Sequence, residues 1–65
     1  MGNSDHKYDG VYQSLPSRAY YRLEGEQVMM RLSQLEKWHE PFLPMTSAEV
    51  ITMFNHGYWR KVGDL

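Results

Sequence analysis

The chain has no cysteine among its 65 residues. Domains this small often depend on disulfides or on a structural metal, and cysteine-based versions of both are excluded here. The absence also excludes a cysteine nucleophile. It is consistent with the reducing conditions of the cytoplasm, where we expect the protein to act.

An excess of basic residues is also missing. Seven Lys and Arg stand against eight Asp and Glu, which gives a formal net charge of -1. Proteins that bind nucleic acid usually carry a clear basic excess, because their cations neutralise phosphates and release counterions. Nucleic acid is therefore the less favoured partner.

Long apolar runs are missing as well. No run approaches the roughly 20 residues that a membrane-spanning helix needs, and the first residues lack the charged and apolar regions of a secretory signal. The start, Met1 to His6, has histidine where an N-myristoylation signal has serine or threonine. We expect neither a membrane partner nor lipidation.

Motifs of catalysis and cofactor binding are absent. The sequence has no glycine-rich phosphate loop and no HExxH zinc pair. His6, His39 and His56 are widely spaced, which is more typical of caps or surface groups than of a metal site. We predict a protein that is not an enzyme, with no catalytic residue, no metal and no cofactor.

An apolar share of 42% indicates a folded core. Residues 1–16 are polar, with two glycines and a proline, and predict a flexible arm ahead of a small domain over residues 17–65. Four apolar or aromatic side chains interrupt the polar pattern: Tyr8, Val11, Tyr12 and Leu15. They either order on a partner or lie across the domain's own core.

Residues 18–33 carry the clearest pattern in the chain. If a turn is centred on residues 24–27, one set of paired positions is apolar or aromatic: Leu23 with Val28, Tyr21 with Met30, and Ala19 with Leu32. The alternate pairs are mostly basic or polar: Arg22 with Met29, Tyr20 with Arg31, and Arg18 with Ser33. This period of two predicts a β-hairpin with one buried face.

A helix over residues 26–38 is the alternative for the second half of that stretch. It places Val28, Leu32 and Leu35 on one stripe. It leaves Met30 outside the stripe and gives no role to the apolar alternation before the turn. The hairpin is therefore favoured.

Two capping boxes predict two short helices. The first, Ser33 to Glu36, begins a helix through Trp38 that must stop before Pro41. An extended connector follows, with Phe42 and Leu43 expected to turn inward.

The second box, Thr46 to Glu49, begins a helix that sets Val50, Ile51 and Phe54 on a core face. This helix should end at Gly57, since glycine tolerates the left-handed conformation that closes a helix.

The C-terminal residues, Tyr58 to Val62, are aromatic and then β-branched, which is more typical of a short strand than of a helix. The predicted fold is a small single α+β domain in which a β-hairpin packs on two short helices. We expect one of Trp38 and Trp59 in its core and the other partly exposed.

Residues 45–62 resemble the opening of a DNA-binding helix-turn-helix, or of the small winged-helix excisionases that place a hairpin beside such a helix. The likeness covers about ten residues and implies that a reading helix follows Gly57. Only eight residues follow Gly57, whereas a helix that enters the major groove needs about three turns. Tyr58 to Lys61 is the only candidate reader.

Two surfaces are left for binding. The outward hairpin face interleaves arginines with Tyr and Met, which matches interaction hot spots and also suits stacking on bases. Its alternative is an ordinary solvated face with a cation–π contact between Tyr20 and Arg31. At the C-terminus, the tryptophan is a core residue or an anchor. The expected partner-binding residues are Arg18, Tyr20, Arg22, Met29, Arg31, Trp59, Arg60 and Lys61.

These observations predict a small non-enzymatic module that binds a larger protein and inhibits or regulates it. Bacteriophage antagonists of host factors and transcription regulators are the kind of protein expected at this size. The alternative is a minimal nucleic-acid-binding regulator of the excisionase or winged-helix type.

Overall fold

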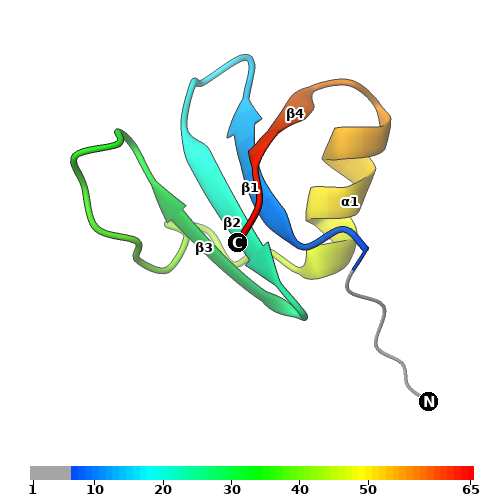
Figure 1. Ribbon diagram of the computed structural model, residues 1–65, viewed down its shortest axis with the longest axis horizontal. Helices are drawn as coiled ribbons and strands as arrows, with labels where there is room; N and C mark the ends of the chain where they lie inside the picture. The colour runs from blue at the N-terminus through cyan, green and yellow to red at the C-terminus, as the bar shows by residue number, and fades with distance from the viewer. Residues whose placement is uncertain (1–6) are drawn as a thin grey trace.

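The computed structural model describes residues 7–65 of the chain. It is a four-stranded antiparallel sheet with one helix packed on one side, in a small compact α+β domain (Figure 1). Along the chain the elements are β1 (Gly10–Ser14), β2 (Tyr20–Glu24), β3 (Gln27–Arg31), α1 (Ser47–Asn55) and β4 (Trp59–Gly63). Across the sheet the order is β3-β2-β1-β4, so the first and last strands of the chain lie side by side.

Residues 1–16 were expected to form a flexible arm, but residues 10–14 of this segment form strand β1. Gly10, Tyr12 and Ser14 are buried while Val11 and Gln13 are half-buried, which is the alternation of a strand with one core face. Tyr12 is only 1% exposed, so it belongs to the domain's own core. Glycine has low strand propensity, and Val11 and Tyr12 are adjacent apolar residues, so the sequence of this segment does not show the alternation. The predictions for residues 1–6, including their lipidation, lie outside the described residues.

The β2–β3 hairpin has the predicted register. Four predicted pairs form: Tyr20 with Arg31, Tyr21 with Met30, Arg22 with Met29, and Leu23 with Val28. Two predicted pairs, Ala19 with Leu32 and Arg18 with Ser33, do not form because β2 begins at Tyr20 and β3 ends at Arg31. The alternative helix over residues 26–38 is wrong.

Arg18 lies in the turn from β1 to β2 and not on the hairpin. Its φ of 67° is in the left-handed region, where the chain reverses direction. The turn is closed by two backbone hydrogen bonds, from Arg18 N–H to the Ser14 carbonyl (2.7 Å) and from Ser14 N–H to the Ala19 carbonyl (2.8 Å).

The helix predicted from Ser33 is wrong, and a turn takes its place. A capping box requires the Glu36 carboxylate to accept from the N–H of Ser33. It accepts instead from the N–H of Leu32 (2.8 Å). His39 then pairs with Met30 through two backbone hydrogen bonds of 2.7 and 2.9 Å. The chain must therefore be extended again by residue 39, which leaves no room for a helix.

Helix α1 agrees with the sequence. Thr46 caps it: its Oγ1 accepts from the Glu49 N–H (3.3 Å), and the Glu49 carboxylate accepts from the Thr46 N–H (2.8 Å). Gly57 follows the cap residue with a φ of 82°, the left-handed conformation predicted for this position. The strand expected after it is β4.

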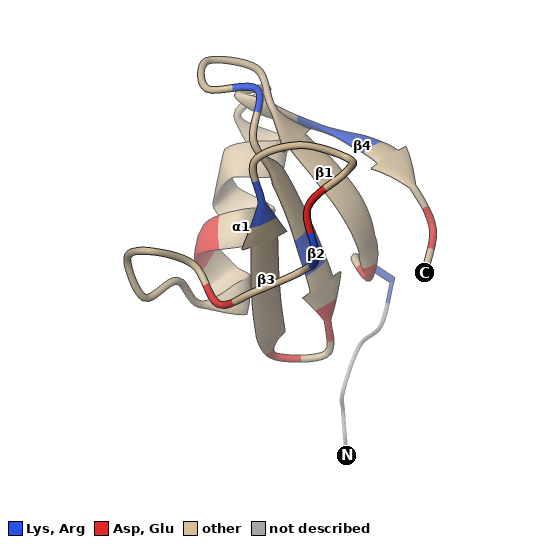
Figure 2. Cartoon of the chain, turned by 90° about the vertical axis from the view of Figure 1, so that its left-hand side faces the viewer, with Lys and Arg blue, Asp and Glu red and all other residues tan. Residues whose placement is uncertain are grey.

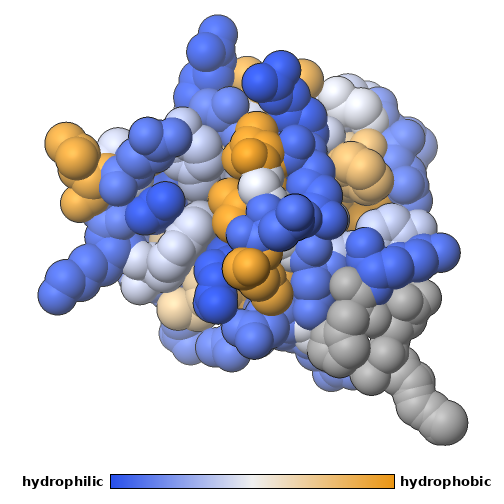
Figure 3. Space-filling view, in the orientation of Figure 1, coloured by the Kyte–Doolittle hydropathy of each residue, from blue (hydrophilic) through white to orange (hydrophobic). Residues whose placement is uncertain are grey.

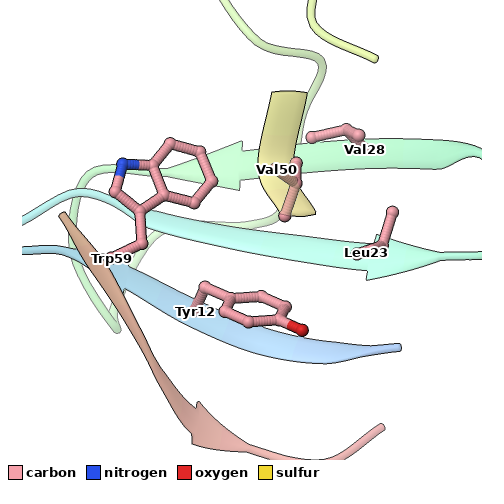
Figure 4. Close-up of a cluster of buried hydrophobic side chains, with 5 residues drawn as sticks. All are labelled: Tyr12, Leu23, Val28, Val50 and Trp59. Carbon is pink, nitrogen blue, oxygen red and sulfur yellow. The ribbon is translucent and has the colours of Figure 1, made fainter. Parts of the chain in front are cut away.

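The core lies between the sheet and α1 and draws a side chain from every element. Figure 4 shows the five buried residues of this cluster: Tyr12, Leu23, Val28, Val50 and Trp59. Ile51 and Phe54, the other members of the predicted helix face, are half-buried and pack against it. Trp59, at 3% exposed, is the core tryptophan, and its ring stacks on Tyr21 with centroids 4.1 Å apart.

Within residues 7–65, no helix has the length and apolar character that crossing a membrane requires.

Candidate protein-binding surface

The side of the sheet away from α1 carries two rows of side chains, because directly opposed residues in antiparallel strands share a face. The first row crosses all four strands: Arg60, Gln13, Tyr20 and Arg31. The second row is Val11, Arg22 and Met29. We call these seven residues the outer face. Their neighbours along the strands, such as Tyr12 and Leu23, point into the core.

The outer face is basic although the chain as a whole is nearly neutral. Arg22, Arg31, Arg60 and Lys61 lie on strands, while most Asp and Glu lie at turns and chain ends (Figure 2). The acid beside the face, Glu24, accepts from Arg22 at 3.0 Å. The side chains of Arg22 and Glu24 are 34% and 55% exposed, so solvent screens the pair and it contributes little to stability.

Arg31 has a structural task within the face. Its guanidinium lies 4.3 Å from the Trp38 ring centre and 6.0 Å from that of Tyr20. Its Nη1 donates to the carbonyls of Gln34 (3.4 Å) and Glu36 (3.2 Å). The predicted contact with Tyr20 is confirmed at the outer limit of a cation–π interaction, and the closer contact with Trp38 was not predicted. Arg31 thus holds the following turn against the sheet.

The connector between β3 and α1, residues 32–46, displays apolar side chains. Leu35 at the tip of its turn is 99% exposed, and Phe42 and Leu43 are 70% and 79% exposed, so the inward orientation expected for the last two is wrong. They stand between Pro41 and Pro44, which restrict the backbone and donate no hydrogen bond. That flanking was the available signal that neither residue joins a packed element.

Figure 3 shows the side of the molecule that carries the outer face. A short run of apolar atoms follows the strands between hydrophilic side chains, and further apolar atoms protrude at the left, where Figure 1 places the residues after β3. The turn that displays them is held by hydrogen bonds, among them Gln34 Nε2 to the Tyr20 hydroxyl (3.3 Å) and Leu35 N–H to Ser33 Oγ (3.3 Å).

Within the connector, the side chains of His39 and Glu36 contact each other, with Nε2 of His39 and Oε1 of Glu36 3.1 Å apart. We call this contact the clasp. The pKa of His39 is raised, first by the hydrogen bond of Nδ1 to the Glu40 carbonyl and then by the Glu36 carboxylate. The pKa of Glu36 is lowered, first by the Leu32 N–H and then by His39. His39 also stacks on Phe42 with ring centres 5.4 Å apart.

The expected partner-binding residues are only partly brought together. The outer face collects Tyr20, Arg22, Met29, Arg31 and Arg60, and Arg18 lies beyond its end, where Gln13 Nε2 donates to the Arg18 carbonyl (3.3 Å). Trp59 is wrong as a surface anchor because it is buried. Lys61 is paired with Tyr12 and so points to the α1 side, where it contacts Asp64 at 3.5 Å.

Sequence reasoning missed Val11, Gln13 and Trp38. The sequence Gly-Val-Tyr-Gln-Ser does not alternate between polar and apolar residues, so it gave no local signal for the first two; the alternation appears only in their burial. Nothing local indicated that Trp38 would lie over Arg31.

Two hollows of the described surface offer little for chemistry. One of about 420 Å³ beside α1 is lined by Met45, Ala48, Glu49, Thr52 and Met53, and its one charged residue, Glu49, is engaged in the capping box. A smaller one of about 200 Å³ lies under Phe42 and Leu43. Within residues 7–65, no three His, Asp or Glu side chains gather as metal ligands would.

No protein-family model matches the chain, and no curated protein and no solved structure matches it significantly.

Proposed function

We propose that this chain is a small non-enzymatic module that binds a larger protein through its outer face and thereby inhibits or regulates that protein. The main support for this proposal is that α1 covers one side of the sheet, whereas the other side presents arginines, tyrosine and methionine in two ordered rows. The connector covers this side at one end, where Trp38 lies over Arg31.

The chemistry of this face supports a protein partner. Arg, Tyr and Met are enriched at protein interfaces, and Arg and Tyr dominate their hot spots. The side chains stand on paired strands, so the backbone that carries them is already ordered before binding. Arg22 and Arg60 are the available cations, which favours an acidic surface on the partner.

A module without chemistry of its own acts by occupying a surface of its partner. Inhibitors and regulators of larger proteins work in this way, and the bacteriophage antagonists of host factors are the kind expected at this size. The absence of cysteine favours action in the cytoplasm.

A matched pair of arginine substitutions tests the proposal. Immobilised parent, Arg22→Glu and Arg18→Glu chains are exposed to the same cell lysate, and the proteins retained by each are identified. Both variants change the charge equally, but Arg22 lies on the outer face and Arg18 in a turn beyond it. We expect a protein retained by the parent and by Arg18→Glu to be lost with Arg22→Glu. Equal retention by all three chains would contradict the proposal.

A nucleic-acid-binding regulator is the second candidate. Tyr20 and Trp38 beside Arg31 supply aromatic surface and positive charge of the kind that stacks on bases. The net charge of -1 weighs against it, as does the presence of one helix of nine residues in the described chain. We expect no shift of duplex DNA by micromolar protein at about 0.1 M salt. A shift that weakens steeply with salt would favour this candidate.

A further inference from the structure

The two edges of the sheet differ in their backbone pairing. At the β3 edge, Met30 and His39 exchange two backbone hydrogen bonds, so the connector pairs with that edge at Met30. At the opposite edge, β4 pairs with β1 on one side, and no strand of the described residues pairs with its other side. Within residues 7–65, β4 is therefore the open edge of the sheet.

The free backbone groups of this edge can be assigned. Leu15 N–H donates to the Tyr58 carbonyl (2.9 Å), so Tyr58 directs its carbonyl toward β1. In an antiparallel pair, successive residues alternate between facing the partner strand and facing away. Arg60 therefore faces β1, whereas Trp59 and Lys61 direct their N–H and C=O groups outward.

Charge decides what can pair there. Arg60, Lys61 and Val62 are all exposed, and Arg60 makes no ion pair within residues 7–65. Lys61 is the middle residue of β4, so a second copy paired antiparallel about its centre would set Lys61 against Lys61. Like charges directly opposite are unfavourable, and lysine on an edge strand commonly prevents such self-pairing. A strand with carboxylates meets no such repulsion.

We propose that β4 binds an extended acidic segment of the partner protein as a fifth strand of the sheet. This inference rests on the proposed function and adds the chemistry of the partner. Main-chain hydrogen bonds to Trp59 and Lys61 supply affinity, as in other cases of strand addition. Specificity comes from a carboxylate opposite Arg60 on the outer face, and neighbouring residues of the segment alternate toward the α1 side beside Lys61.

The test uses a short synthetic peptide of alternating valine and glutamate, with a valine and lysine peptide as the control, added to the isotope-labelled chain. We expect the acidic peptide to shift the amide NMR signals of Trp59 and Lys61 and to slow their hydrogen exchange. The Arg60 amide, which already faces β1, should change little. This alternation distinguishes strand addition from a nonspecific electrostatic contact.

Three variants separate the backbone from the charge. Lys61→Pro removes an outward N–H together with the lysine charge, at an edge position where proline is tolerated, whereas Lys61→Gln removes the charge alone. Lys61→Pro should abolish peptide binding and Lys61→Gln should only weaken it, while near-ultraviolet circular dichroism of the aromatic core remains. Arg60→Gln should weaken binding by up to about fivefold, the worth of one cross-strand ion pair. If Lys61→Pro does not fold, the alternation in the parent chain and the Arg60→Gln result decide the question.

Three results would overturn the inference: no binding of the acidic peptide at millimolar concentration, equal binding of the basic peptide, or shifts at Tyr20 and Arg22 without shifts at Trp59 and Lys61. Arg22→Glu distinguishes the two proposals, since it should leave peptide binding unchanged while it removes the protein partner. Loss of the partner without any peptide binding would leave the outer face as the interface and exclude the open edge.

Discussion

Leu23 and Leu35 are the same side chain in opposite surroundings. Leu23 is 1% exposed in the core cluster, whereas Leu35 is 99% exposed at the tip of the connector turn. Burial of an apolar side chain is the main source of stability in so small a domain. Leu35 can contribute almost nothing to it.

This pair gives a stability prediction. Leu23→Ala should lower the free energy of unfolding by about 2–5 kcal/mol, because it removes buried methyl groups and leaves a cavity. Leu35→Ala should change it by less than about 0.5 kcal/mol. Urea titration of both variants measures the difference. Similar losses for the two would mean that Leu23 is not a core residue.

Two glycines occupy positions where a larger residue would be unfavourable, for different reasons. Gly57 has a φ of 82° and open space where a Cβ would stand, whereas at Gly10 a Cβ would lie 2.8 Å from the Gly63 carbonyl oxygen. Gly57→Ala should cost about 1–2 kcal/mol from backbone strain alone. Gly10→Ala should cost more, because β1 and β4 must also separate. Thermal unfolding of both variants ranks them, and the reverse order would be inconsistent with the close β1–β4 approach.

At the scale of elements, local signals were predictive where an element is closed by its own neighbours. The β2–β3 register follows from residues on either side of one turn, and the cap of α1 from Thr46 and Glu49. β1 and the connector depend on partners far along the chain. β1 is a strand because β4 pairs with it, and the turn after Arg31 replaces a helix because His39 returns to Met30.

The same distinction explains what was predicted of the surface. Tyr20, Arg22, Met29 and Arg31 were placed on one face because the hairpin alone determines it. Gln13 and Arg60 belong to the first row because β1 pairs with both β2 and β4, which places Gln13 beside Tyr20 and Arg60 beside Gln13. No local pattern contains that arrangement.

The connector turn should respond to pH through His39 and Glu36. His39 has a raised pKa, so its contribution is fully present below the ordinary histidine value and is lost as pH rises through the raised one. Glu36 has a lowered pKa, so its contribution is present above the ordinary glutamate value and is lost as pH falls through the lowered one. The clasp is therefore complete between about pH 4.5 and 6.5, the ordinary pKa values of glutamate and histidine.

Titration of the His39 ring signals by NMR checks this prediction. The midpoint should lie above about 6.5, and Glu36→Gln should lower it. In Glu36→Gln the midpoint should still lie above the ordinary histidine value, since the Glu40 carbonyl still accepts from Nδ1. An unchanged midpoint in Glu36→Gln would show that the clasp does not form in solution.

At the scale of the whole molecule, β1 joins two parts that are separate in sequence. It pairs with β2 of the hairpin on one side and with β4, the strand after α1, on the other. Its Tyr12 ring meets Phe54 of α1 edge-on, with centres 5.3 Å apart, and its hydroxyl donates to the Tyr8 carbonyl. Without β1, the sheet that α1 packs on would be divided between the hairpin and a single strand.

Neighbouring residues of β1 give the sharpest test of this arrangement. Tyr12→Asp places a carboxylate in the centre of the core, where an unpaired charge is strongly destabilising, and should leave the chain unfolded, because a domain of this size has only a few kcal/mol of stability to lose. Gln13→Asp introduces the same group one residue later on the outer face, where it meets solvent, Tyr20 and Arg60, so that chain should fold. Near-ultraviolet circular dichroism of Trp59 and Tyr21 reports the packed core in each variant. A folded Tyr12→Asp chain would mean that β1 is dispensable and that the hairpin, α1 and β4 form the domain by themselves.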